Sequence, residues 1–357
     1  MAERRERKGR TAPRTAAPRP SSAIRLKSPP RRVIAFTGAN TMLGRNLIGL
    51  YEEEDRVGKI LAIDVQSPPT AGAKTRFYKL DLTQPNVDAR LAETLEAERV
   101  DTFVHLAFLS NPTHASGWAH ELESVGTMHV LGACEAHRVR KFVLRSLTAL
   151  YGPDPSNPNF LDERRPLHAT DRSRFLRDKI EADTQVQKFA DRRPESVVTI
   201  LRTCTILGPT VRNYMARYLS RPVVPVIMGF DPLFQFLHEV DAVRAFKMAI
   251  DRDHPGVFNI VGDGVLPLST VIRVAGRLAI PVPYFVASPL ASALWLARGI
   301  EAPPTFLDYL RYLCVADGEK AEREMGYRPI YSTHEALTEF VGAERLRQLR
   351  LLRDANA

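Results

Sequence analysis

The chain has 357 residues, of which 44% are hydrophobic and 25% are charged, and its formal net charge is +9. This balance excludes a disordered or collagen-like chain and predicts a globular protein with one large domain or two coupled domains. The charge is local: residues 1–32 contain 11 Lys/Arg and 2 Asp/Glu, which leaves 39 residues of each sign in the remainder. The body of the chain therefore gives no support for nucleic-acid binding.

Residues 1–32 form a basic tail with five prolines and few large apolar side chains. Such a segment buries too little apolar surface to offset the entropy lost on ordering, so we expect it to be disordered. Two roles stay open: a solubilising arm, or a loose contact with an acidic partner, RNA or an anionic membrane. Glu3 and Glu6 interrupt the basic run and argue against a transit peptide.

From residue 33 onward, short runs of β-branched residues alternate with longer amphipathic segments, which predicts a Rossmann-type, doubly wound parallel α/β sheet. We expect strands at 31–38, 59–65, 75–82, 100–108, 140–152 and 196–209. We expect helices at 40–54, 87–98, 121–139 and 172–193. The pattern becomes irregular and proline-rich after residue 210, where helices are predicted near 241–250 and 334–350. The expected organisation is thus a Rossmann domain at 33–210 and a smaller lobe at 211–357, with segments returning to the sheet.

Three cysteines, Cys134, Cys204 and Cys314, are widely spaced among apolar residues. This pattern predicts reduced, buried thiols in a cytoplasmic protein, with neither a disulfide framework nor a metal site. The apolar stretch at 285–297 is too short to cross a bilayer and contains Pro289. We expect a core helix or a lid helix there, and no transmembrane segment.

The first predicted strand runs into TGANTMLG at 37–44, which predicts a dinucleotide-binding turn. Gly38 and Gly44 suit a tight turn and close packing of helix on strand. Thr41 stands where a second glycine is usual, so its side chain would narrow the approach or offer a hydroxyl to a phosphate. The backbone N–H groups at the start of the following helix would face a pyrophosphate, and they belong to Asn40, Thr41, Met42 and Leu43.

Asp64 ends the second predicted strand, twenty residues after Gly44. A carboxylate there can accept hydrogen bonds from the 2′- and 3′-hydroxyls of an adenosine ribose and would repel a 2′-phosphate. The expected cofactor is therefore NAD, with NADP less favoured. A solvated aspartate at the end of a strand would be the structural alternative.

Taken together, these residues resemble the extended short-chain dehydrogenase/reductases, the NAD-dependent epimerase/dehydratase family. The resemblance extends over about residues 33–345 and rests on the order of several motifs: HLA at 105–107, LYG at 150–152, LRTCTILGP at 201–209, FLHEVDAV at 236–243 and VFNIVGDG at 257–264. It implies further cofactor contacts at Asp81, Leu82, Leu106, Ala107 and Phe108, the last replacing a small residue. It also implies a homodimer formed through the helices that carry Glu123 and Lys179.

The same resemblance implies a catalytic tetrad of tyrosine, lysine, serine or threonine, and asparagine, with the lysine lowering the pKa of the tyrosine and holding the nicotinamide ribose. In this chain Phe175, Leu147 and Glu123 occupy the tyrosine, serine/threonine and asparagine places, and only Lys179 is kept. Ser146 and Thr148 flank Leu147 but should point to other faces of the strand. If the helix is out of register, Phe175 is simply a core residue.

The substrate side also departs from the nucleotide-sugar enzymes that the chain resembles in outline. Phe234 stands where those enzymes place an arginine that clamps a diphosphate, and this exchange is not conservative. Thr205 replaces a customary asparagine, so a nucleotide-sugar substrate is not predicted. Either an apolar pocket or ordinary core is expected around Phe230, Phe234 and Phe236, and the predicted substrate pocket comprises Thr205, Phe234, Phe236 and His238.

Two functions remain open from the sequence. The first is a dinucleotide-binding sensor, scaffold or partner-binding protein with a degenerate catalytic tetrad. The second is an active NAD-dependent oxidoreductase or epimerase on a small, fairly apolar substrate that uses substitute acid/base groups. The candidates for that role are His105, His168, His238, Asp171 and Glu123.

Overall fold

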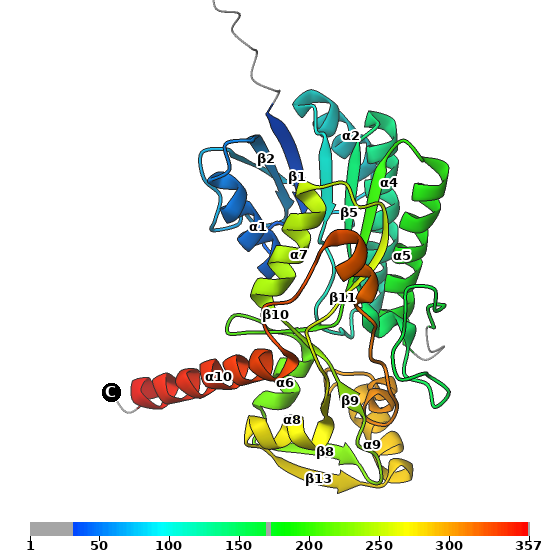
Figure 1. The fold of residues 1–357 in the computed structure, drawn as a ribbon, viewed down its shortest axis with the longest axis vertical. Helices are drawn as coiled ribbons and strands as arrows, with labels where there is room; N and C mark the ends of the chain where they lie inside the picture. The colour runs from blue at the N-terminus through cyan, green and yellow to red at the C-terminus, as the bar shows by residue number, and fades with distance from the viewer. Residues whose placement is uncertain (1–30, 169–172, 356–357) are drawn as a thin grey trace, which may run out of the picture. The chain divides into compact units, whose positions relative to one another are not determined.

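Seven parallel strands form the central sheet of the computed structural model, which describes residues 31–168 and 173–355 (Figure 1). From edge to edge they are β11 (Gly256–Ile260), β6 (Val197–Thr203), β5 (Lys141–Leu147), β4 (Thr102–His105), β1 (Arg32–Thr37), β2 (Val57–Asp64) and β3 (Thr75–Lys79). All strands run in the same direction, but the order in which they are added to the sheet reverses between β1 and β4. At such a point a parallel sheet opens a crevice at the carboxyl ends of its strands. The predicted Rossmann-type fold is confirmed. The predictions for residues 1–30 and for Asp171 fall outside the described residues.

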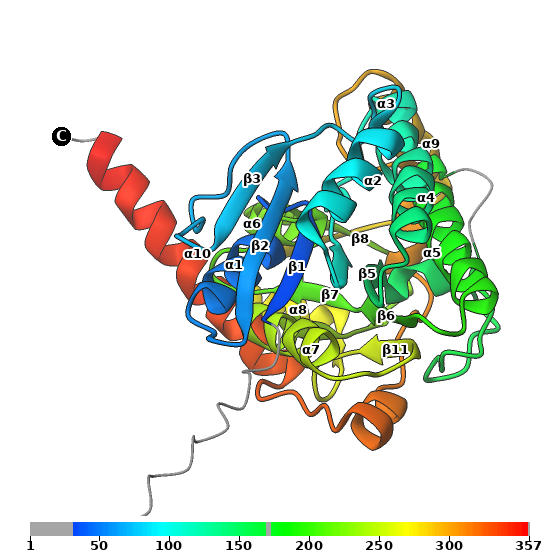
Figure 2. The ribbon, with the colours of Figure 1, turned by 90° about the horizontal axis from the view of Figure 1, so that it is seen from above.

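Helices cover both faces of this sheet (Figure 2). One face carries α2 (Val87–Glu98), α4 (Gly126–His137) and α5 (Arg174–Arg192), whose Leu91, Val130 and Val186 are buried in one apolar cluster with the strands. The opposite face carries α1 (Met42–Glu52) and α7 (Glu239–Asp251), which are buried in a second cluster. Both α7 and β11 come from beyond residue 210, so the later part of the chain does contribute to the sheet layer.

Several expected strands are shorter in the structure. β3 ends at Lys79 and β4 at His105, because the chain leaves the sheet there toward the crevice. The strand expected at 196–209 divides at Cys204 into β6 and β7 (Thr205–Leu207). β7 leaves the large sheet and pairs with β10 (Phe236–His238). This division brings the substrate-side segments close to the end of the sheet.

The helix expected at 121–139 begins earlier and is not uniform. It consists of α3 (Ser116–His120), a π-helical turn at Glu121–Val125, and α4. A π-helical turn places one more residue in the turn and so rotates the side chains that follow it. Glu123 lies within this turn and is fully buried.

The C-terminal lobe is built from short paired strands and helices. Its strands pair as β8 (Val223–Ile227) with β13 (Leu278–Val282) and β9 (Leu233–Phe234) with β12 (Leu266–Pro267). Its helices are α6 (Tyr214–Ser220), α8 (Leu268–Ala275), α9 (Tyr284–Leu296) and α10 (Thr333–Ala355). Shorter helical turns lie at Thr148–Tyr151, Pro304–Leu310 and Ala321–Met325.

α9 corrects one expectation. None of its residues is buried, so the stretch at 285–297 is not a core helix, and only its interpretation as a lid remains open. Within the described part of the chain, no helix is long and apolar enough to cross a membrane. The three cysteines are free thiols; Cys134 and Cys204 are buried and Cys314 is half-buried.

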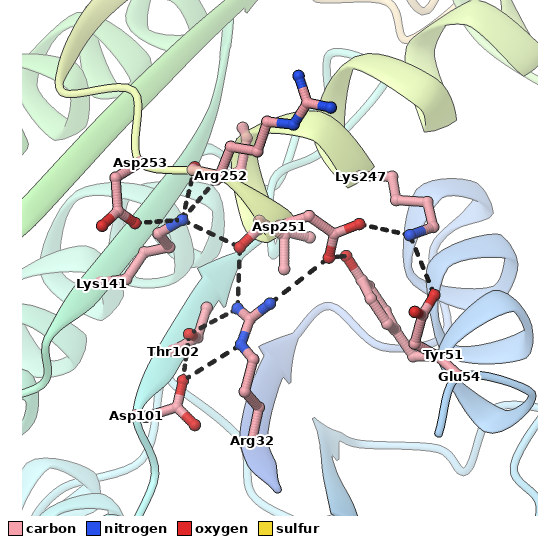
Figure 3. Close-up of polar contacts among 12 residues, drawn as sticks. Arg32, Tyr51, Glu54, Asp101, Thr102, Lys141, Lys247, Asp251, Arg252 and Asp253 are labelled. Atoms are coloured by element: carbon pink, nitrogen blue, oxygen red, sulfur yellow. Dashed lines mark hydrogen bonds and ion pairs between the residues drawn. The ribbon is translucent and has the colours of Figure 1, made fainter. Parts of the chain in front are cut away.

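A network of charged residues joins the amino-terminal edge of the sheet to the end of α7 (Figure 3). Lys141 at the start of β5 has a fully buried side chain, and its Nζ donates to the carbonyl oxygens of Ala249, Ile250 and Arg252 at 3.1, 3.0 and 2.6 Å. The same Nζ lies 2.8 Å from a carboxylate oxygen of Asp253. A cation at the carboxyl end of a helix satisfies carbonyls that lack intrahelical partners and complements the helix dipole.

We expect Lys141→Met to lower the free energy of unfolding by about 2–3 kcal/mol, because several buried acceptors lose their donor at once. The neighbouring Arg140 provides a matched control, since its ion pair with Asp253 is half exposed on both sides. Arg140→Met should cost less than about 1 kcal/mol. Urea denaturation of the two variants would measure the difference, and equal losses would show that Lys141 does not cap α7.

Candidate functional site

Two glycines shape the loop between β1 and α1. Gly38 has a φ of +64°, and a Cβ added to it would lie 2.7 Å from the backbone of Leu106 and Ala107. A Cβ on Gly44 would lie 2.5 Å from the carbonyl oxygen of Gly38. Both positions therefore require glycine, and the loop lies against the end of β4 as a dinucleotide fold requires.

Thr41 caps α1. Its hydroxyl donates to the carbonyl oxygen of Gly38 at 2.7 Å and accepts from the N–H of Gly44 at 3.1 Å. A hydroxyl has one proton, so Thr41 has none left to donate to a phosphate. The expectation that Thr41 could offer its hydroxyl to a phosphate is thereby corrected: its role is that of an N-cap.

Asp64 ties the end of β2 to the same loop. One of its carboxylate oxygens accepts from the N–H of Asn40 at 2.9 Å, and the other from the N–H of Val65 at 2.7 Å. Each carboxylate oxygen keeps a free lone pair for a further donor. Asp64 is half-buried beside the loop, where a ribose hydroxyl could reach it.

The remaining predicted cofactor contacts, Asp81, Leu82, Leu106, Ala107 and Phe108, are not among the residues that line the cleft beside the glycine loop. Asp81 accepts from the N–H and hydroxyl of Thr83. Leu82, Leu106 and Phe108 are buried, and Phe108 meets His105 edge-on at 5.0 Å between ring centroids.

A cleft of about 300 Å³ lies next to the loop and brings together much of the predicted site. Its walls include Asn40, Thr41, Met42, Leu43, Leu147, Phe175 and Thr205. Phe175 and Leu147, at the predicted tyrosine and serine/threonine places, therefore line the same cleft as the glycine loop. Lys179 does not line this cleft but lies behind it, beside a very small adjoining cavity.

The ammonium of Lys179 is held by other groups of the chain. Nζ forms an ion pair with Glu123 and donates to the carbonyl oxygen of Leu109 at 3.0 Å, and the N–H of Leu109 donates to Glu123 at 2.7 Å. The Lys179 side chain is 3% exposed and that of Glu123 is 0% exposed. The residue in the asparagine place thus neutralises the one kept member of the tetrad.

Burial is the largest influence on both partners. It raises the pKa of Glu123 and lowers the pKa of Lys179, while each partner opposes the shift of the other. Wherever the shared proton lies, the pair carries no net charge. A neutral pair cannot supply the positive field that would lower the pKa of a nearby phenol.

Phe175 covers this pair. Its ring centroid lies 4.3 Å from Nζ of Lys179, a cation–π contact, and the ring also lines the cleft. Phe175 therefore lies between the lysine and the cavity, one helical turn from Lys179 as the spacing predicts. Phe175 is half-buried and in contact with Lys179, and its assignment to the tyrosine place stays a prediction.

The flanking hydroxyls point away from Leu147 as expected. Ser146 donates to Asp183 at 2.5 Å, and Asp183 also forms a buried ion pair with Arg202 at 2.8 Å. Thr148 is buried in the turn that follows β5. Neither hydroxyl lines the cleft.

The cleft residues that the sequence analysis missed include Arg145 and Tyr214. Arg145 precedes Leu147 by two residues on β5, so both side chains are on the same face of the strand. Its guanidinium donates to the carbonyl oxygen of Phe108 at 3.2 Å. The alternation along the strand was a signal that could have identified Arg145, but only tertiary structure places Tyr214 here.

The predicted substrate pocket does not come together as one site. Thr205 lines the cleft, whereas Phe234 lines a separate apolar cavity. Phe236 is fully buried between β7 and α10, and His238 is buried as the N-cap of α7 with its Nε2 3.0 Å from Glu339. Phe236 and His238 are therefore corrected to structural positions, because pairing of β10 with β7 turns them away from the cleft.

His105 is not available as a substitute acid or base. Thr127 donates its hydroxyl proton to the carbonyl oxygen of Glu123, so it must accept from Nε2–H of His105 at 3.1 Å. Nδ1 then accepts from Thr37 at 2.6 Å. Burial lowers the pKa of His105 to about 3, which keeps the ring neutral at physiological pH.

This neutral histidine predicts a pH dependence of stability. The unfolded chain binds a proton at His105 below about pH 6.5, whereas the folded chain does not until about pH 3, so stability falls as the pH decreases between these values. The His105 contribution is on the order of 4 kcal/mol across that window. His105→Gln should flatten the dependence in urea denaturation followed from pH 7 to pH 4. An unchanged profile would contradict the buried neutral ring.

The other candidates for a substitute acid or base in the described part of the chain do not gather at the cleft. His168 is exposed, and Glu123 is committed to Lys179. Away from the cleft, His120, Asp178 and Glu181 each place one ligand atom within 4.8 Å of the others. His120 and Asp178 form a hydrogen bond of 2.9 Å, which explains why these two side chains lie together without a metal ion.

The parallel sheet, the glycine loop at its crevice and the strand-end aspartate define a Rossmann-type protein with a dinucleotide-binding architecture. A family model described as the NAD dependent epimerase/dehydratase family matches residues 34–261. The chain belongs to this family. The predicted resemblance is confirmed.

Two relatives of known sequence are described as uncharacterized proteins. A protein of Mycobacterium tuberculosis is 33% identical over 320 residues, which covers 87% of this chain and 83% of the relative. A protein of Escherichia coli is 23% identical over 85% of this chain and 95% of its own length.

Solved structures share the fold at low sequence identity. The UDP-glucose 4-epimerase of Thermotoga maritima, solved with UDP-glucose, superposes with a TM-score of 0.69 at 17% identity over 88% of this chain and 99% of the epimerase. The dTDP-glucose 4,6-dehydratase of Bacillus anthracis, solved with NAD, gives a TM-score of 0.66 at 17% identity over 89% and 98% of the two chains.

Proposed function

We propose that this chain binds a nicotinamide dinucleotide in a site that does not perform the tyrosine-assisted hydride transfer expected of the family. It would act as a dinucleotide-responsive sensor or scaffold. The observation that carries this proposal is the state of Lys179: it is buried, neutralised by Glu123 and covered by Phe175, which has no proton to exchange.

The loop between β1 and α1 supports the binding half of the proposal. Gly38 and Gly44 permit close backbone packing that any Cβ would prevent, and α1 presents the amino-terminal end of an eleven-residue helix to the crevice. Asp64 has lone pairs for the ribose hydroxyls and would repel a 2′-phosphate, which favours NAD over NADP. The fold relatives solved with NAD, such as the dehydratase of Bacillus anthracis, agree with this choice.

The cleft suits the nicotinamide half of a dinucleotide less well than the loop suits the pyrophosphate and ribose. A bound dinucleotide would supply hydride acceptance or donation at its nicotinamide ring. In this chain, however, Phe175 and Leu147 stand at the predicted tyrosine and serine/threonine places of the cleft, and Arg145 lines it as well. None of these three side chains exchanges a proton near neutral pH.

An enzymatic alternative has one residue in its favour. Tyr214 contributes a phenol to the same cleft from α6. Burial raises the pKa of Tyr214, so its phenol stays protonated and could act only as a proton donor. This alternative keeps hydride transfer on an apolar substrate, with Tyr214 replacing the missing tyrosine.

The test is a comparison of three proteins against one panel of carbonyl and alcohol compounds, followed at the absorbance band of reduced nicotinamide. The wild type should show no turnover above buffer. The triple variant Phe175→Tyr, Leu147→Ser, Glu123→Asn restores the missing groups and frees Lys179, so it should gain activity. Wild-type turnover that is lost in Tyr214→Phe would overturn the proposal in favour of the alternative.

The expected homodimer and the expected contact of the basic tail belong to the same proposal. A homodimer would form through α5 and the helical segment that comprises the π-helical turn with Glu123 and α4. The basic tail would contact an acidic partner. Sedimentation of the full chain and of a chain lacking residues 1–32 would test both.

A further inference from the structure

A second cavity, of about 310 Å³, lies in the C-terminal lobe next to the cleft. It is enclosed by α6, by α9 and by the segment from Ile300 to Leu310, and apolar side chains make up most of its wall. Phe234, Leu290, Leu294 and Leu307 are among them. A concave, mostly apolar space of this size is typical of a site for a small apolar ligand.

α9 forms one wall of this cavity. Ala287, Leu290, Ala291 and Leu294 line the cavity, and their spacing of three and four residues puts them on one face of the helix. Two of the four are alanines, so the helix leaves space instead of filling it. The helix is apolar, yet none of its residues is buried, which means that its inner face lacks the packing that a bound ligand would provide.

Two stacking contacts hold the ends of α9 in place. The guanidinium of Arg311 lies 3.7 Å from the ring centroid of Tyr284 at its start. The ring of His114 stacks on Trp295 at 3.8 Å near its end. Both ends of α9 are therefore tied to the segments that neighbour the cavity.

The cavity adjoins the cleft through aromatic residues. Tyr214 lines both spaces, and Phe306 meets Tyr214 edge-on at 5.0 Å and Phe175 at 6.2 Å between ring centroids. At the cavity wall, Oδ1 of Asn111 is buried and has no hydrogen-bond partner among the described residues. A buried acceptor without a donor is costly, so a ligand that donates to it would be favoured.

We propose that this cavity binds the hydrocarbon part of a single-chain amphiphile, such as an acyl chain, with its polar end at Asn111 beside the cleft. The aliphatic walls suit a chain that has no polar groups along its length, and the one unpartnered polar atom suits a single head group that carries a donor. This proposal rests on the cavity and not on dinucleotide binding. A ligand here would contact Tyr214 and Phe306, and through Phe306 it would reach Phe175 in the neighbouring cleft.

Titration of the full chain with a fluorescent long-chain alcohol, with dodecan-1-ol as competitor, tests the proposal, because a hydroxyl head group carries the donor that Oδ1 of Asn111 lacks. The wild type should bind the probe and release it to dodecan-1-ol. Ala291→Trp fills the cavity and should weaken binding by at least about tenfold. Leu296→Trp makes the same change on the outer face of α9, where Leu296 is 82% exposed, and should leave binding unchanged.

Absence of probe binding would overturn the proposal, as would equal weakening by the two tryptophan variants, which would indicate adsorption to the surface of α9. If Ala291→Trp fails to fold, Ala287→Leu provides a smaller change in the same wall. NAD titration of the same samples separates the two proposals. Binding of the alcohol probe without NAD binding would reject only the dinucleotide function, and the reverse result would reject only the cavity ligand.

Discussion

Lys179→Met is expected to lower the free energy of unfolding by about 3–5 kcal/mol. The change leaves Glu123 buried without its counter-ion, and Glu123 must then either stay charged in an apolar site or take up a proton. Removing one partner of a buried ion pair is costly for this reason, whereas a solvated lysine could be replaced with little effect. Urea denaturation at pH 7 would measure the loss.

The control is a double-mutant cycle with Glu123→Gln. Each single variant leaves one buried group uncompensated, but the double variant leaves none, so its loss should be smaller than the sum of the two. Phe175→Leu removes the cation–π contact and the ring contact with Phe306 but leaves the ion pair, and it should cost about 1 kcal/mol. A loss below about 1 kcal/mol for Lys179→Met would show that the lysine is free, as in an ordinary catalytic site.

Gly44→Ala is expected to lower the free energy of unfolding by about 3 kcal/mol, the upper part of the range for overpacking. The new Cβ would lie 2.5 Å from the carbonyl oxygen of Gly38 and 2.6 Å from that of Ala39, and backbone atoms cannot move aside cheaply. The loop that faces the crevice must then shift away from α1. The same variant should therefore lose affinity for NAD.

Gly49 is a matched control in the same helix. A Cβ there would meet only the side chain of Thr70 at 3.8 Å, an ordinary contact. Gly49→Ala should be neutral or stabilising by up to about 1 kcal/mol, because alanine is the better helix former. Thermal denaturation of the two variants gives the comparison. If both behave alike, the close approach of α1 to the loop is not real.

The parts of this molecule that depend on local pattern could be predicted from the sequence. Alternation of strand and helix led to the parallel sheet, and the spacing of Gly38, Gly44 and Asp64 located the crevice loop. The separation of Phe175 and Lys179 by one helical turn was enough to predict their contact. Each of these inferences concerns residues close together in the chain or elements in a regular order.

The interactions that decide the state of the site could not be predicted in this way. Glu123 and Lys179 are 56 residues apart, and only the packing of α5 against the π-helical turn joins them. The π-helical turn has no sequence signal comparable to a glycine loop. Thr41 could either cap α1 or face a phosphate, and only the geometry of the hydroxyl chooses the cap.

The substrate side shows the same limit. Phe234 and Phe236 are both apolar and two residues apart, yet one lines a cavity and the other is in the core, because a break between β9 and β10 separates them. α9 is apolar enough in sequence for a core helix, but it lies at the surface over a cavity. Burial of such segments depends on what packs against them, and composition does not contain that information.

Calorimetric titration of NAD into the folded wild-type chain tests the central claim most directly. The account predicts one molecule bound per chain with a dissociation constant in the range of about 1–100 μM, weaker binding of NADP because of Asp64, and loss of binding in Gly44→Ala. No heat of binding from either NAD or NADH, in a protein shown to be folded, would contradict it.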